Sequence, residues 1–343
     1  MLNVAGAEVK VKRKYWVTGY VGEGAAQMLS ELQDMENVQL LEKVISNRLV
    51  RFLYYRLSKL TGQFTRAAFV KRLFYPWYAI FHEKYDSEGK DCLLFINSGF
   101  CKEYDEKVID RVRRKFPDLR FILYIVDPMS GFETPEHMRI IRKMDLVFSI
   151  NREDCLKYGF RYYPLVYSVS ERAADKQTVE NDLYYLGSGD DRNVELQQIY
   201  EKCERMALNT QIHVLADANS QMTGICFHRE PIPYEENLKL LKQSNCILEV
   251  MHKEFDNPTQ RYSEAVVYNK KLLTNNPKTA EFDFYNPQYM QIFHSIEEID
   301  YSFVKEREEV NYGYKGEFSP KLFIEEIQKI LDEGEDSWML SVN

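Results

Sequence analysis

The sequence lacks the features that mark a disulfide-stabilised, zinc-binding or membrane-spanning protein. Its six cysteines include no Cys-x-x-Cys pair, which argues against a disulfide framework and against a zinc site. No uninterrupted apolar run reaches about 18 residues, so no transmembrane helix is predicted. The first residues lack the apolar core of a signal peptide. We therefore expect a cytoplasmic protein with reduced thiols, no metal and no cofactor.

Acidic residues are missing from one stretch, although the chain carries a net charge of −8. Between Glu42 and Glu83 every charged residue is Lys or Arg, and these alternate with Phe, Tyr and Trp. The overall acidity argues against nucleic acid as a partner. The stretch 48–77 instead favours peripheral contact with the inner face of an anionic membrane, or binding of a phosphate-bearing acceptor. The alternative is a packed helix whose arginines pair with distant acids.

Length and hydrophobic pattern predict two α/β domains. A chain of 343 residues exceeds the usual size of a single compact core. Apolar strands at 91–96, 120–126 and 145–150 alternate with helical patterns, as in a parallel sheet covered on both faces. A polar linker around 170–181 separates the halves. We therefore place one domain at 1–170 and the other at 181–317.

The stretch 231–276 carries the strongest functional pattern. A helix leads into the apolar strand Cys246–Val250, a polar loop follows, and a second helix is predicted to begin at Glu264, before a strand at 271–274. This alternation builds parallel sheets. The loop therefore falls at the carboxyl end of the sheet, where open α/β sheets bind ligands.

This stretch resembles the donor-binding region of GT-B glycosyltransferases, through His252, Thr259, Arg261, Glu264 and the segment 270–275. The resemblance is closest to the group-1-like and CgeB-like bacterial enzymes of surface-polysaccharide assembly. Three further segments resemble parts of the same branch: FPDLRFILYIVDPM, DLVFSINREDCLKYGFRYYPLVYS and DLYYLGSGDDRN.

The resemblance implies a fold and an activity. The fold is α/β and GT-B-like, with two Rossmann-like parallel-sheet domains facing a central cleft and a final helix, 319–332, returning to the first domain. The activity is metal-independent transfer of a sugar from a nucleotide-sugar donor to a growing surface glycan or lipid-linked acceptor. Basic side chains and helix N-termini then stabilise the leaving diphosphate.

The resemblance also implies roles for particular donor-binding residues. Glu264 matches the carboxylate that accepts hydrogen bonds from the ribose hydroxyls, and Asp256 precedes it at the Glu-x7-Glu spacing of many group 1 enzymes. Arginine suits a diphosphate, since its planar fork donates two parallel hydrogen bonds. The expected diphosphate contacts are Arg261, Arg192, Gly187 and Gly189. His252 and Thr259 are expected to shape the pocket.

Two carboxylates are candidates for catalysis. Glu23 follows a glycine turn after the first strand, and Asp127 stands at the end of the strand 120–126. Each also has a structural interpretation, Glu23 as a solvated residue at a helix start and Asp127 as a turn residue before Pro128.

Two other functions remain open on the sequence. The chain fits a non-catalytic partner that binds nucleotide-sugars or glycans in an assembly complex. It also fits a GT-B-fold sugar-nucleotide epimerase, which would isomerise the donor and need no acceptor.

Overall fold

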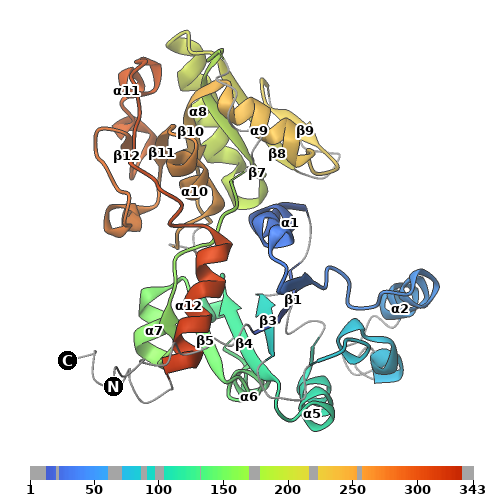
Figure 1. Ribbon diagram of the computed structural model, residues 1–343. Coiled ribbons are helices and arrows are strands. Elements are labelled where there is room, and N and C mark those ends of the chain that lie inside the picture. Colours follow the sequence, from blue (N-terminus) through green and yellow to red (C-terminus); the bar gives the residue numbers. More distant parts are fainter. Residues whose placement is uncertain are drawn as a thin grey trace, which may run out of the picture. The chain divides into compact units, whose positions relative to one another are not determined.

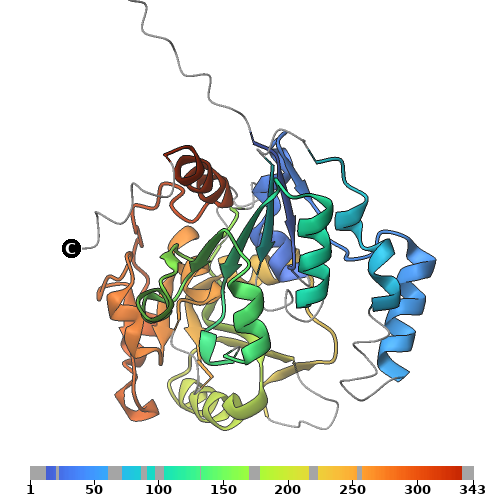
Figure 2. The ribbon, with the colours of Figure 1, turned by 90° about the horizontal axis from the view of Figure 1, so that it is seen from below.

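The computed structural model divides the chain into two compact units. Unit 1 comprises Met1–Tyr163 and Phe323–Asn343, and unit 2 comprises Pro164–Leu322. The residues described are 13–20, 23–60, 72–85, 91–96, 104–131, 133–169, 178–215, 223–252 and 257–333. The side chains of residues 23–24, 58–60, 131 and 190 are not included. Each unit contains a six-stranded parallel sheet flanked by helices (Figures 1 and 2).

The sheet of unit 1 has the strand order β2-β1-β3-β4-β5-β6. Its strands are β1 (Tyr15–Thr18), β2 (Val38–Leu40), β3 (Cys92–Ile96), β4 (Arg120–Ile125), β5 (Leu146–Ser149) and β6 (Arg161–Tyr162). β3 is buried at every position, and β4 at every position after Arg120. Such continuous apolar runs suit parallel strands, because helices cover both faces of the sheet.

The described helices of unit 1 are α1 (Glu23–Met28), α2 (Arg48–Leu60), α5 (Glu106–Lys115), α6 (Pro135–Ile141), α7 (Arg152–Tyr158) and most of α12 (Pro320–Glu333), and three of them begin at well-formed caps. Asp105, Thr134 and Asn151 each accept a hydrogen bond from a backbone N–H in the first turn of α5, α6 and α7. These caps explain why the helices start where they do.

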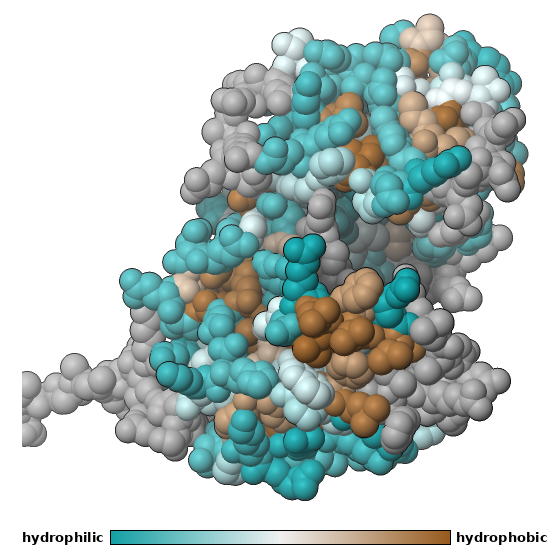
Figure 3. Space-filling model, turned by 90° about the vertical axis from the view of Figure 1, so that its right-hand side faces the viewer, coloured by the Kyte–Doolittle hydropathy of each residue, from teal (hydrophilic) through white to brown (hydrophobic). Residues whose placement is uncertain are grey.

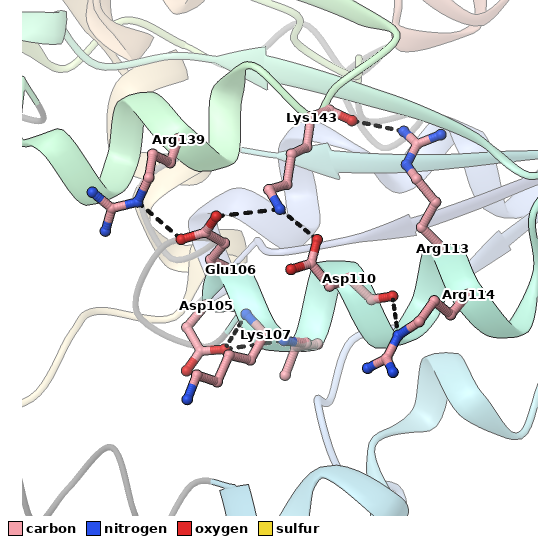
Figure 4. Close-up of polar contacts among 9 residues, drawn as sticks. Asp105, Glu106, Lys107, Asp110, Arg113, Arg114, Arg139 and Lys143 are labelled. Carbon is pink, nitrogen blue, oxygen red and sulfur yellow. Dashed lines mark hydrogen bonds and ion pairs between the residues drawn. The ribbon is translucent and has the colours of Figure 1, made fainter.

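An ion-pair cluster joins α5 to the end of α6 (Figure 4). Lys143 Nζ lies 3.2 Å from Glu106 and 2.5 Å from Asp110, and Arg139 lies 2.9 Å from Glu106. Arg113 donates to the backbone carbonyl of Lys143 at 2.6 Å. Because these side chains are partly exposed, solvent screens each pair and its contribution to stability is small. The cluster is therefore a structural clamp between two helices.

The sheet of unit 2 has the strand order β12-β11-β10-β7-β8-β9. Its strands are β7 (Asn181–Ser188), β8 (Thr210–Leu215), β9 (Cys226–His228), β10 (Ser244–Glu249), β11 (Lys271–Thr274) and β12 (Met290–Ile292). The chain starts at the centre with β7, builds outward to β9, returns to β10 and builds outward on the other side. This is the 3-2-1-4-5-6 order of doubly wound nucleotide-binding sheets, which bind ligands where the order reverses.

The α-helices described in unit 2 are α8 (Asn193–Arg205), α9 (Tyr234–Lys242), α10 (Gln260–Val267) and α11 (Tyr301–Lys305).

A buried lysine fixes the segment that follows α11. Lys271, buried in β11, donates to the carbonyls of Phe303 and Glu306 at 3.1 Å each and pairs with Glu308 at 2.6 Å. These contacts hold the extended segment after α11 against the sheet.

The final helix, α12, packs on the sheet of unit 1. The ring of Phe323 lies 4.7 Å from Tyr124 and 5.0 Å from Phe148, measured between centroids. Tyr15 donates a hydrogen bond to Gln328 at 3.1 Å, and Arg13 pairs with Asp332 at 3.1 Å. The C-terminal helix therefore completes the core of the N-terminal unit (Figure 1).

We predict that Phe323→Ala lowers the free energy of unfolding by about 3–5 kcal/mol, because it leaves a cavity among aromatic rings. Leu322→Ala is the matched control: the preceding side chain is 42% exposed, and its removal should cost about 0.5 kcal/mol or less. Urea unfolding followed by circular dichroism measures both. Equal losses in the two variants would contradict the packing of α12.

Candidate functional site

The point where the strand order of unit 2 reverses lies between β7 and β10. These two strands are adjacent, with Cys246 paired to Leu183 and Ile247 to Tyr184. At their carboxyl ends, Arg192 Nη1 donates to the carbonyl of Val250 at 3.2 Å, and its Nη2 bonds to the hydroxyl of Ser188. One guanidinium thus bridges the ends of both strands.

The glycine turn after β7 has no room for side chains. A Cβ on Gly189 would lie 2.8 Å from Val214 Cγ1 and 2.1 Å from Asn193 Oδ1. A Cβ on Gly187 would lie 2.7 Å from the hydroxyl of Tyr185. Glycine therefore lets the backbone pass close to β8 and to the start of α8, so that backbone N–H groups can approach a ligand.

The N-terminus of α8 has no side-chain cap among the described residues, and the 3₁₀ turn Asp190–Arg192 leads directly into it. Arg192 Nε and Asn193 Oδ1 are both buried without a hydrogen-bond partner. Two orphaned buried polar atoms are unusual in one short segment. Uncapped N–H groups, the helix dipole and a guanidinium together form an environment that favours an anion.

Polar side chains connect this turn to β10 and β11. His252 Nδ1 lies 2.7 Å from a carboxylate oxygen of Asp191. Asn275, just after β11, accepts from the backbone N–H of Met251 at 2.7 Å and donates to Glu195 at 3.2 Å. His252 therefore lies at the same edge of the sheet as Arg192.

Glu249, the last residue of β10, holds the start of α10. Its buried carboxylate accepts hydrogen bonds from the hydroxyls of Thr259 and Thr274, the second at 2.5 Å. Thr259 also caps α10, accepting from the backbone N–H of Arg261 at 3.0 Å. Burial raises the pKa of Glu249, and the two threonine hydroxyls partly oppose this. The sequence analysis missed Glu249, for which the available signal was a carboxylate inside an otherwise apolar strand.

Arg261 and Glu264 form a buried ion pair in the first turn of α10. Glu264 is fully buried, and its Oε2 pairs with Arg261 Nη1. Its Oε1 accepts from Gln260 at 3.2 Å and from the Tyr167 hydroxyl at 3.5 Å. Burial raises the pKa of Glu264 while the guanidinium lowers it. Both carboxylate oxygens thus have partners, and a ribose can bind only by replacing one of them.

The other three residues predicted from the sequence are Asp256, Glu23 and Asp127. Asp256 lies outside the described residues. Glu23 is the first residue of α1, and its side chain is not described. Asp127 follows β4 in unit 1 and is half-buried. Its neighbouring loop is tied to α7 by the hydrogen bond from Met129 N–H to Asp154, at 2.9 Å.

The described residues contain neither a metal-ligand cluster nor a membrane-spanning helix. No group of three or more His, Cys, Asp or Glu side chains there is arranged to hold a metal ion. No helix in the same residues is long and apolar enough to cross a bilayer.

We predict that the stability contributed by Glu249 falls as pH rises. Its pKa is higher in the folded chain than in the unfolded chain, so the folded state binds the extra proton. The contribution is therefore complete below the unfolded pKa, about 4.3, and is lost as pH rises through the folded pKa.

The side chain in Glu249→Gln cannot titrate. The difference in unfolding free energy between wild type and this variant should therefore shrink as pH rises from the unfolded pKa through the folded pKa. Urea unfolding across pH 4–8 measures it, with the exposed Glu281→Gln as control; a pH-independent difference would contradict the buried assignment.

Comparison with known proteins identifies the fold. No family model and no curated protein matches the sequence. The solved structure of trehalose-6-phosphate synthase OtsA matches with a TM-score of 0.56 and 11% identity, over 93% of this chain and 99% of that one. A UDP-forming α,α-trehalose-phosphate synthase from Burkholderia vietnamiensis matches at 0.47 and 9%, over 77% and 85% of the two chains. The DNA-modifying β-glucosyltransferase matches at 0.44 and 11%, over 93% and 98%.

The likeness to OtsA spans both units and nearly the whole of each chain. Together with the two six-stranded parallel sheets, it confirms the predicted α/β, GT-B-like fold built from two Rossmann-like units.

Proposed function

We propose that this protein is a glycosyltransferase that moves a sugar from a nucleotide-sugar donor to a growing surface glycan or a lipid-linked acceptor. The observation that carries the proposal is the turn at 187–192, which favours an anion and lies where the strand order of unit 2 reverses. A nucleotide diphosphate is the ligand that such a turn suits, because the turn combines close backbone approach, a helix N-terminus and an arginine.

The donor diphosphate is assigned to Gly187, Gly189, Arg192 and the first N–H groups of α8. Arg192 uses one N–H of Nη1 and one of Nη2 to bridge the two strands, and its buried Nε has no partner. A guanidinium has five N–H donors in all. This positive, preorganised environment would stabilise the leaving diphosphate in a metal-independent transfer.

The ribose is assigned to Glu264. We propose that the ribose hydroxyls replace Gln260 and Tyr167 on Oε1 while Arg261 remains paired to Oε2. Burial raises the pKa of Glu264 and Arg261 opposes this, which favours the charged form; a charged carboxylate accepts hydrogen bonds more strongly than a neutral one. Thr259 and Glu249 would serve this contact indirectly, because they fix the first turn of α10.

The other assignments rest on the sequence resemblance. We propose that His252 and Asp256 shape the donor pocket and that Arg261 adds positive charge near the diphosphate. Glu23 and Asp127 are our proposed catalytic carboxylates, since both follow the carboxyl ends of strands in unit 1. The surface-glycan or lipid-linked acceptor likewise follows from the resemblance to the CgeB-like branch.

We predict that Arg192→Met weakens nucleotide binding about 10–100-fold, the equivalent of one or two charge-assisted hydrogen bonds. Arg205→Met, at the far end of the same helix, should leave affinity unchanged. Titration calorimetry with UDP, GDP and CMP measures both and identifies the base. If no nucleotide binds, or both variants bind as tightly as wild type, the diphosphate assignment is wrong.

We predict slow hydrolysis of the preferred nucleotide-sugar in the absence of acceptor, and a lower rate in Glu264→Gln. Both variants remove the charge that pairs with Arg261, but glutamine keeps the shape of the side chain and an acceptor oxygen, whereas alanine removes these as well. Chromatography of the products distinguishes the rival functions. An unaltered donor indicates a binding protein, and an isomerised donor indicates an epimerase.

A further inference from the structure

Helix α2 turns its apolar stripe away from the core of unit 1. Tyr54, 2% exposed, anchors the helix among the rings of Phe74 and Tyr78, at centroid distances of 5.5 and 6.3 Å. Val50, one turn earlier, packs against the same core. The inward side of α2 is thus occupied by residues 50 and 54, and the apolar side chains at 49, 52 and 53 lie elsewhere on the helix.

These outward side chains form an exposed apolar surface. Leu49, Phe52 and Leu53 share one face with Arg56, at the i, i+3, i+4, i+7 spacing of a helical stripe. Large apolar side chains of α2 and of the turn at 73–77 are between 41% and 68% exposed: Leu49, Phe52, Leu53, Tyr55, Leu57, Leu73 and Trp77. Figure 3 shows brown side chains gathered on this face of unit 1. We call this set the α2 surface.

The sequence segment that contains the α2 surface carries only positive charge. Between Glu42 and Glu83 there are eight basic residues and no acidic ones: Lys43, Arg48, Arg51, Arg56, Lys59, Arg66, Lys71 and Arg72. The side chains of Lys59, Arg66 and Lys71 lie outside the described residues. The whole chain carries −8, so the remainder carries −16. Arg48, Arg56 and Arg72 are exposed, and the guanidinium of Arg56 lies 5.6 Å from the ring centroid of Phe52. Basic and apolar groups therefore share one face.

We propose that the α2 surface docks on an anionic lipid bilayer, with Leu49, Phe52 and Leu53 entering the headgroup region and the arginines contacting lipid phosphates. A helix lying in the interface needs this combination of an apolar face and flanking cations. Tryptophan and tyrosine, here Trp77 and Tyr55, prefer the same depth. An acidic protein would otherwise be repelled by a negative membrane, so a local cluster of cations is required for such contact.

Nucleic acid is the rival occupant, since it is also anionic. Aromatic side chains can stack on bases and arginines can bind phosphates. Four of the exposed side chains, however, are leucines, which neither stack on bases nor bind phosphate. Removing leucines from water favours a lipid phase, and this distinguishes the α2 surface from a nucleic-acid groove.

The proposal extends the lipid-linked acceptor of the proposed function, but its test uses neither donor nor acceptor. The full chain is centrifuged with vesicles of phosphatidylcholine, with or without phosphatidylglycerol. Wild type should bind the anionic vesicles at least about tenfold more tightly, with binding weakened by salt. Equal binding to both vesicles, or tighter binding to duplex or single-stranded DNA than to vesicles, would overturn the proposal. Loss of nucleotide binding would leave this result unaffected.

Matched variants separate the apolar and basic contributions. Phe52→Ser with Leu53→Ser should reduce vesicle binding about tenfold at every salt concentration. Leu156→Ser, on α7 and 82% exposed, is the control and should have no effect. Arg48→Gln with Arg56→Gln should remove the preference for phosphatidylglycerol, unlike Arg114→Gln on α5. If both test variants bind like wild type, the α2 surface is not the docking site.

A spectroscopic measurement on the unaltered helix guards against misfolded variants. Trp77 is exposed and Trp16 is buried. Anionic vesicles should shift the tryptophan emission of wild type to shorter wavelength, because Trp77 moves out of water. The shift should disappear in Trp77→Phe. An unchanged emission spectrum for vesicle-bound wild type would contradict insertion of this surface.

Discussion

The reversal of strand order in unit 2 is the constraint on which the candidate site depends. Because β7 lies at the centre and its neighbours β8 and β10 are reached in opposite directions, no connection crosses between the carboxyl ends of β7 and β10. Arg192 bridges those two ends through Ser188 and Val250. Without this topology, residues from 187–192 and from 250–264 would have no common edge at which to meet.

Because the Arg261–Glu264 pair is buried, a ligand can contact it only by replacing existing partners. A carboxylate inside a protein is costly unless a cation and hydrogen bonds satisfy it, and here Arg261, Gln260 and Tyr167 do so. Glu249 has the same need and is satisfied by two threonine hydroxyls. Two buried acids in neighbouring elements make the start of α10 well ordered. A ligand there meets preorganised groups, and each contact that it makes must replace an existing one.

The two units divide their charge differently. The acid-free stretch 43–82 belongs to unit 1, and it includes α2, a helix whose apolar stripe faces outward. The ion-pair cluster between α5 and the end of α6, in contrast, balances two acids, Glu106 and Asp110, against two bases, Arg139 and Lys143. An unbalanced, partly apolar surface costs solubility, which explains why single-sign patches of this kind accompany binding more often than packing.

The sequence by itself determined the class of fold. Apolar strands that alternate with helical patterns predict a parallel α/β sheet. The sequence also predicts that the candidate binding residues follow strands: Gly187, Arg192, Thr259 and Glu264. Tertiary structure alone decided which strands are neighbours, that Glu249 joins the site, and that Glu264 faces inward. It also decided that residues 49, 52 and 53 of α2 face solvent, because helical periodicity defines a stripe but not the direction in which it points. That direction is set by what lies on each side of the helix, here the rings that hold Tyr54.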